Sequence, residues 1–178
     1  MMRFIFVALL FALMSCGQKE KMVLNGMIGR KIHFPETMID VNSQQVCESG
    51  VKVLSFVDSN LCTECYLKTL KFWDIILPEI DSLNCSVLFV FSPVDENLEE
   101  FISMIREECK FPAKIDVDNE FILKNKFIRG HGVEYSTVLL DAENQIKLVG
   151  NPVYNTRIWS LYKNTIPAMI QSEIKANE

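Results

Sequence analysis

The sequence predicts one α/β domain in which helices flank a central mixed sheet. Residues 51–57 and 85–91 are almost entirely apolar, as expected of central strands that are covered on both faces. Between these runs, apolar residues recur at helical spacing from Cys62 onward. Near the C-terminus, two short apolar runs flank residues 141–144, a pattern that predicts an antiparallel hairpin. This alternation of strands and helices is typical of a layered α/β domain.

The N-terminus predicts a secretion signal over residues 1–15. Arg3 supplies a positive charge, and the apolar run of residues 4–14 is shorter than the roughly 20 residues that span a bilayer. Removal of this segment leaves roughly 160 residues, enough for one domain with a substantial core.

The end of this signal resembles the lipobox of bacterial lipoproteins at Leu13, Ser15 and Cys16. In that motif the cysteine receives lipid and becomes the mature N-terminus. The resemblance implies a lipidated tether over residues 16–27, with the folded domain at 28–178. It also implies delivery to the outer membrane, because position 17 is not aspartate. The alternative is an ordinary secretion signal with a chance cysteine.

The start of the domain predicts an edge strand or short hairpin over residues 28–35, closed by Pro35. Residues 36–50 are mixed and polar, and we expect a loop there. The buried strand at 51–57 follows.

The helix that begins at Cys62 carries an apolar stripe, and Pro78 lies inside it. A proline inside a helix removes a hydrogen bond and clashes with the preceding turn, so the helix should kink or end near Leu77. The strand at 85–91 follows, and Asp95 offers an N-cap for the next helix.

The remaining elements are expected from the same periodicities, and Pro167 should break or restart the last helix. In order they are a helix with the apolar face Leu98, Phe101, Ile102, Ile105 and Cys109, a strand at 113–117, a helix at 119–127, the hairpin of 137–140 and 145–149, and a helix carrying Ile158, Leu161, Tyr162 and Ile166.

The charge of the chain argues against a nucleic-acid partner. There are 18 basic and 23 acidic residues, a net charge of −5, and no basic cluster. Since an exported chain meets an oxidising environment, we expect that disulfides between its cysteines can form and persist.

Cys62 and Cys65 form the constellation that carries chemistry. They open a helix directly after a buried strand, where the helix dipole and unpaired N–H groups stabilise a thiolate. Cys62 is expected to be partly exposed and to attack a disulfide; Cys65, one turn further in, would resolve the mixed disulfide. Glu64 opposes thiolate formation, which Lys68 and Lys71 would offset if they lean toward the site.

Two other interpretations of this pair stay open. One is a permanent structural disulfide. The other is metal binding, although a single Cys-x-x-Cys lacks a second ligand pair, so we expect no metal and no other cofactor.

The element order resembles the thioredoxin-like superfamily over residues 28–165, and in particular its TlpA-like membrane-anchored thiol-disulfide oxidoreductases. The resemblance depends on Cys62 and Cys65 after their strand and on residues 132–137 leading into 138–141. It implies a thioredoxin-like fold with an N-terminal strand or hairpin extension and an inserted strand and helix. The implied partners are disulfides of exported proteins or a membrane redox partner.

Three residues depart from the family pattern. Leu61 replaces the usual tryptophan, and Phe56 stands where thioredoxin has a buried acid. The loop Tyr135, Ser136 and Thr137 should face the cysteines as the substrate loop, but it has no proline where the family has a cis-proline. A trans bond before Ser136 is therefore expected, because a cis bond at a non-proline residue costs about 2.5–4 kcal/mol.

These departures keep two further functions open. The first is a non-enzymatic binding module in which the disulfide only staples a loop. The second is peroxide reduction, because Ser59, three residues before Cys62, resembles the pattern of peroxiredoxins. Ser55 stands where peroxiredoxins have a proline.

The other thiols and a histidine complete the candidates. Cys85 and Cys109 are expected in the core, whereas Cys47 could pair with another cysteine or serve as a distal redox partner. His131 is either a proton shuttle near the loop or a surface histidine in a turn.

Overall fold

The computed structural model describes residues 24–42, 50–59, 62–93 and 97–176. Six strands form one mixed sheet in the order β1-β4-β3-β2-β5-β6, with β2, β3 and β4 parallel to one another. The strands are β1 (Ile39–Asp40), β2 (Lys52–Val57), β3 (Ser86–Phe91), β4 (Ala113–Ile115), β5 (Thr137–Leu140) and β6 (Ile146–Val149). The predicted central mixed sheet is confirmed, and the hairpin is formed by β5 and β6.

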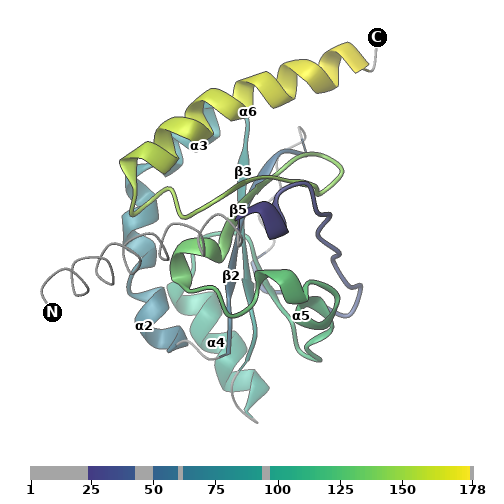
Figure 1. Cartoon of the computed structure of the whole chain (residues 1–178). Helices are drawn as coiled ribbons and strands as arrows, with labels where there is room; N and C mark the ends of the chain where they lie inside the picture. The colour runs from purple at the N-terminus through teal and green to yellow at the C-terminus, as the bar shows by residue number, and fades with distance from the viewer. Residues whose placement is uncertain (1–23, 43–49, 60–61, 94–96, 177–178) are drawn as a thin grey trace, which may run out of the picture.

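Helices cover both faces of this sheet, with α2 and α3 on one side and α5 on the other (Figure 1). The helices are α2 (Thr63–Leu67), η1 (Leu70–Ile75), α3 (Leu77–Ser82), α4 (Leu98–Glu108), α5 (Glu120–Lys124), η2 (Lys126–Ile128), η3 (Val133–Tyr135) and α6 (Thr156–Ala176). None of the helices in the described ranges is long and apolar enough to cross a membrane.

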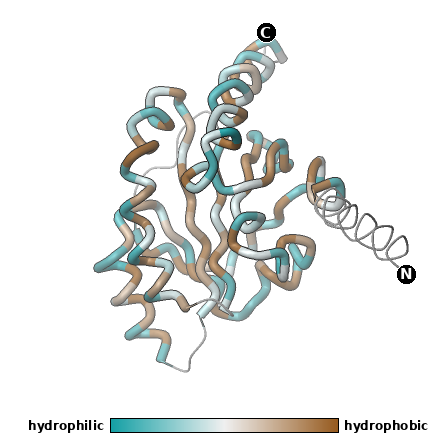
Figure 2. Tube along the Cα trace, turned by 60° about the vertical axis from the view of Figure 1, so that its left-hand side comes forward, coloured by the Kyte–Doolittle hydropathy of each residue, from teal (hydrophilic) through white to brown (hydrophobic). Residues whose placement is uncertain are grey.

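The sheet divides the core in two because successive side chains of a strand point to opposite faces. In β2, Val53 and Val57 pack with α2, η1, α3, α4 and α6, whereas Leu54 and Phe56 pack with α5 and η2. Figure 2 shows the central strands as mostly hydrophobic tubes between more mixed helices. Both faces of β2 are therefore buried, which fixes the point where the chain leaves the sheet toward Cys62.

The N-terminal part corrects the prediction. Residues 28–35 do not form a strand or hairpin; Lys31 makes a single antiparallel bridge to Gln145. Gly29 has a φ of 82°, a left-handed conformation that interrupts extended pairing. The extra strand is β1, which lies within the segment predicted as loop and pairs antiparallel with β4, supported by an ion pair between Asp40 and Lys114.

The predicted helix after Cys62 is also not continuous. It divides into α2, η1 and α3. The expected interruption near Leu77 is confirmed, since η1 ends at Ile75 and Pro78 lies in the first turn of α3. The first break lies at Thr69, where both the backbone N–H and the hydroxyl donate to the carbonyl of Tyr66, at 2.8 and 2.6 Å. Three-residue bonds of this kind tighten the chain into a 3₁₀ turn.

The middle of the chain agrees with the prediction in outline. Asn97 caps α4 by accepting from the N–H of Glu100, while the expected cap Asp95 lies outside the described residues. The predicted helix at 119–127 is divided into α5 and η2.

Pro167 does not break the last helix, which corrects the prediction. Helix α6 runs through Pro167 as one continuous ribbon (Figure 1). Ile166 is fully buried, and Met169 and Ile170 pack against the same core beyond the proline. Packing on both sides of Pro167 thus outweighs the hydrogen bond that its missing N–H cannot make.

Candidate redox site

Cys62 and Cys65 form a disulfide at the start of α2, with their Cα atoms 5.2 Å apart. Cys62 is the N-cap residue, and its Sγ accepts the backbone N–H of Cys65 at 3.3 Å. A hydrogen-bond donor at this sulfur, at the positive end of the helix dipole, favours a thiolate on Cys62. The local sequence contributes to this geometry because β2 ends at Val57, a few residues before α2 begins.

Both cysteine side chains are exposed. Cys65 lies within the first turn of α2, after Cys62 at its N-cap, and this position does not bury it. The short helix explains this, since α2 ends at Leu67 and carries its buried residues at Thr63, Tyr66 and Leu67. What distinguishes the two sulfurs is the N–H directed at Cys62.

An open cleft of about 450 Å³ lies over the disulfide. Its lining comes from α2 and its N-cap, from the N-cap of η1, from η3 and from the segment before α6. It is made by Cys62, Cys65, Tyr66, Thr69, Val133, Glu134 and Tyr154. Glu134 is the charged residue of this lining. A partner sulfur can therefore reach the disulfide through a mainly uncharged opening.

The loop predicted to face the cysteines lies directly behind one wall of this cleft. Val133 and Glu134, rather than the following three residues, line the cleft. The carbonyl of Ser136 accepts from the N–H of Phe56 at 2.9 Å, which attaches the loop to β2. The described residues contain no cis peptide bond, so the bond between Tyr135 and Ser136 is trans, as expected.

A chain of buried hydroxyls connects the two walls of the cleft. The hydroxyl of Tyr66 lies 2.9 Å from Oγ of Ser55, which lies 2.9 Å from Oγ1 of Thr137. Burial raises the pKa of Tyr66 far above its ordinary value, so this phenol stays neutral. This chain was not predicted from the sequence; the signal that could have revealed it is Ser55, a hydroxyl residue among the apolar residues 53–57 of β2.

Phe56 leaves no carboxylate at the position of the buried acid. Its ring is buried and packs against Phe121, with the ring centres 5.6 Å apart. The adjacent cavity, of about 120 Å³, includes Asp58 and His131 in its lining. Asp58 pairs with Arg129 at 3.0 Å. His131 thus lines this second cavity and not the cleft over the disulfide, which disfavours its role as a shuttle.

The charge of Glu64 is offset locally. Its carboxylate pairs with Lys68 at 2.7 Å, and both side chains are exposed. The hydrogen bond to Lys68 lowers the pKa of Glu64, and the same bond raises the pKa of Lys68. Lys71 does not lean toward the sulfurs but lies over the ring of Phe72.

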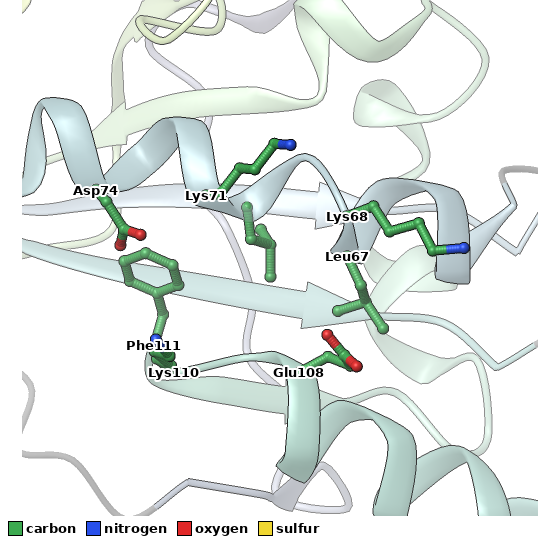
Figure 3. Close-up of a pocket in the computed structure, with 8 residues that line it drawn as sticks. Leu67, Lys68, Lys71, Asp74, Glu108, Lys110 and Phe111 are labelled. Atoms are coloured by element: carbon green, nitrogen blue, oxygen red, sulfur yellow. The ribbon is translucent and has the colours of Figure 1, made fainter.

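Figure 3 shows a different pocket, of about 240 Å³, behind the cysteine-bearing segment. It is lined by Leu67, Lys68, Leu70, Lys71, Asp74, Glu108, Lys110 and Phe111. The charged side chains at its rim have both signs, and neither cysteine of the pair lines it. It is therefore not part of the redox site.

The remaining thiols are placed as expected where they are described. Cys85 and Cys109 are buried, and burial raises the pKa of Cys109 to about 11. Cys16 and Cys47 lie outside the described residues. Within the described ranges no group of three potential metal ligands is found.

No family model matches this chain. No curated protein matches it either.

Solved structures with a similar fold do exist. A candidate protein disulfide isomerase of Bacteroides thetaiotaomicron is 24% identical, with a TM-score of 0.51, over 81% of this chain and 90% of that one. A candidate electron transfer protein of Aquifex aeolicus is 15% identical, with a TM-score of 0.55, over 79% and 95%. A thiol:disulfide interchange protein of a Bacteroides species is 16% identical, with a TM-score of 0.50, over 74% and 89%. The chain therefore has a thioredoxin-like fold.

Proposed function

We propose that this protein is a thiol-disulfide oxidoreductase that reduces or exchanges disulfides of exported proteins. The observation that carries the proposal is the exposed Cys62–Cys65 disulfide, whose first sulfur accepts an N–H at a helix start and opens onto a cleft. A disulfide that only staples the fold has no need of such access. The thioredoxin-like fold, and the names of the similar structures, support the same chemistry.

The reaction is an exchange in two steps. The Cys62 thiolate attacks one sulfur of a client disulfide; that bond breaks, and the other client sulfur leaves as a thiolate and takes a proton from water. Cys65 then loses its proton to water and attacks the Cys62 sulfur, which releases the second client thiolate and forms the Cys62–Cys65 disulfide. The client gains two electrons and the cysteine pair loses two. The reverse sequence oxidises a client dithiol.

The proposal also places the protein in the cell envelope. The signal over residues 1–15 and the lipobox ending at Cys16 support a lipid anchor, with residues 16–27 leading to the domain at 28–178. The end of this segment already belongs to the folded domain, since Met27 is buried in its core. A lipid-anchored domain at the outer membrane would meet exported proteins, or a membrane redox partner that supplies electrons.

A redox titration of the full chain tests the activity. The protein is equilibrated in buffers of graded potential, and free thiols are alkylated. Mass spectrometry then gives the alkylated fraction of the peptide that contains both cysteines. A midpoint above about −300 mV is expected, because structural disulfides of secreted proteins lie below that value. A lower midpoint, or an absence of exchange with oxidised glutathione, would favour the non-enzymatic binding module.

A further inference from the structure

The 3₁₀ helix η1 presents one exposed face beside the disulfide. A 3₁₀ helix has three residues per turn, so Thr69, Phe72 and Ile75 lie above one another on that face. Thr69 lines the cleft over the disulfide. Phe72 is 40% exposed and Ile75 is 71% exposed. An apolar face therefore begins at the cleft and continues away from it along η1.

Tyr154 joins this face to the cleft from the other side. It comes from the segment between β6 and α6, is 53% exposed, and also lines the cleft. Its ring meets the ring of Phe72 edge to face, with the centres 6.4 Å apart. We call Thr69, Phe72, Ile75 and Tyr154 the aromatic strip.

The aromatic strip gathers apolar surface that is otherwise scattered. Eight large apolar side chains are exposed among the described residues, and three of them belong to the strip: Phe72, Ile75 and Tyr154. Single exposed apolar residues are ordinary, whereas a contiguous group marks a contact site.

The size of the strip indicates what occupies it. A stable dimer buries about 800 Å² on each partner, far more than three partly exposed side chains supply. The strip is continuous with the cleft through which a client sulfur must pass. We propose, resting on the proposed function, that the aromatic strip binds an apolar side chain of the client segment that flanks the reacting cysteine.

The geometry also gives the position of that side chain. Phe72 follows Cys62, the sulfur that holds the client, by ten residues, which corresponds to about 15–20 Å of helix. An extended client chain advances about 3.3 Å per residue. The apolar residue should therefore stand about five positions from the client cysteine.

Pairs of glutathionylated peptides test this inference with the reduced full chain. Each peptide has one cysteine, with leucine or glutamine about five positions after it or about five positions before it, and the release of glutathione is followed over time. In one of the two orientations the leucine peptide should react roughly tenfold faster than its glutamine partner, the factor expected when about half a leucine side chain leaves water.

Substitutions assign the preference to the strip. Phe72→Gln and Ile75→Gln should each reduce the leucine-to-glutamine rate ratio below about threefold. Leu123→Gln is the matched control, because Leu123 is 58% exposed in α5 and belongs to neither the cleft nor the strip. This control should leave the ratio unchanged.

The outcomes separate the inference from the proposed function. Equal rates for leucine and glutamine peptides in both orientations would overturn the inference, as would a Leu123→Gln variant that loses the preference equally. A concentration-dependent dimer that Phe72→Gln abolishes would also overturn it, since a second copy would then occupy the strip. Absence of exchange between the wild-type chain and oxidised glutathione would instead overturn the proposed function itself.

Discussion

At the scale of single residues, both cysteines are exposed, and a hydrogen bond distinguishes their sulfurs. The N–H of Cys65 points at the Cys62 sulfur, and a donor so placed stabilises a thiolate in the reduced protein. The pH dependence of reaction with a client should therefore follow the thiol of Cys62, since only the thiolate attacks.

Trapping experiments follow from this difference. Cys65→Ser should accumulate mixed disulfides with clients, because the resolving thiol is missing, whereas Cys62→Ser should trap almost none. Iodoacetamide at neutral pH should modify Cys62 faster than Cys65 in the reduced protein, as measured by peptide mass spectrometry. Faster modification of Cys65 would reverse the two roles.

Tyr66 offers a second prediction at this scale. Tyr66→Phe removes one end of the hydroxyl chain but leaves Ser55 bonded to Thr137. A loss of about 0.5–1.5 kcal/mol in the free energy of unfolding is expected, measured by urea denaturation.

The matched control is Tyr162→Phe, which removes a buried hydroxyl that donates to the carbonyl of Gly150, at 3.0 Å. Only Tyr66→Phe should also speed hydrogen exchange at the N–H of Phe56, which holds the loop through Ser136. Equal exchange in the two variants would show that the hydroxyl chain does not hold the cleft walls together.

At the scale of elements, the strongly patterned segments could be predicted from the sequence. The strands β2 and β3 and the hairpin of β5 and β6 were identified because their apolar runs are bounded by turn residues. Strand β1 was missed because two residues carry no period, and its pairing depends on β4, which is far away in sequence. The break at Thr69 depends on a side-chain hydrogen bond that residue spacing does not reveal.

In helix α6 the prediction of a break at Pro167 was wrong, because packing on both sides of the proline outweighs its unfavourable effect on the helix. Replacing Pro167 by alanine restores a backbone donor in a helix that already continues past this point. Pro167→Ala should stabilise the protein by about 1–3 kcal/mol in urea denaturation. Asn164→Ala, at an exposed site of the same helix, is the propensity control and should gain only about 0.5 kcal/mol. A gain from Pro167→Ala no larger than the control would mean that the helix ends at the proline.

At the scale of the whole molecule, the site could be predicted in part. Cys62 and Cys65 were found because their spacing brings both sulfurs onto the first turn of a helix. The walls of the cleft were not found, since Val133, Glu134 and Tyr154 reach the disulfide from separate segments that only the folded sheet brings together. A pattern within one segment predicts local chemistry, while the shape of a binding surface depends on contacts between segments.

The last prediction concerns how the whole molecule is held in the envelope. Leu13, Ser15 and Cys16 after a short apolar run support lipidation of Cys16. Metabolic palmitate labelling should mark the wild-type chain and not Cys16→Ser, because the lipid is attached through that cysteine. Cys47→Ser is the matched control and should label normally, since Cys47 lies well beyond the tether. Equal labelling of the wild type and Cys16→Ser, or labelling of neither, would remove the anchor and leave a protein that meets its clients by diffusion.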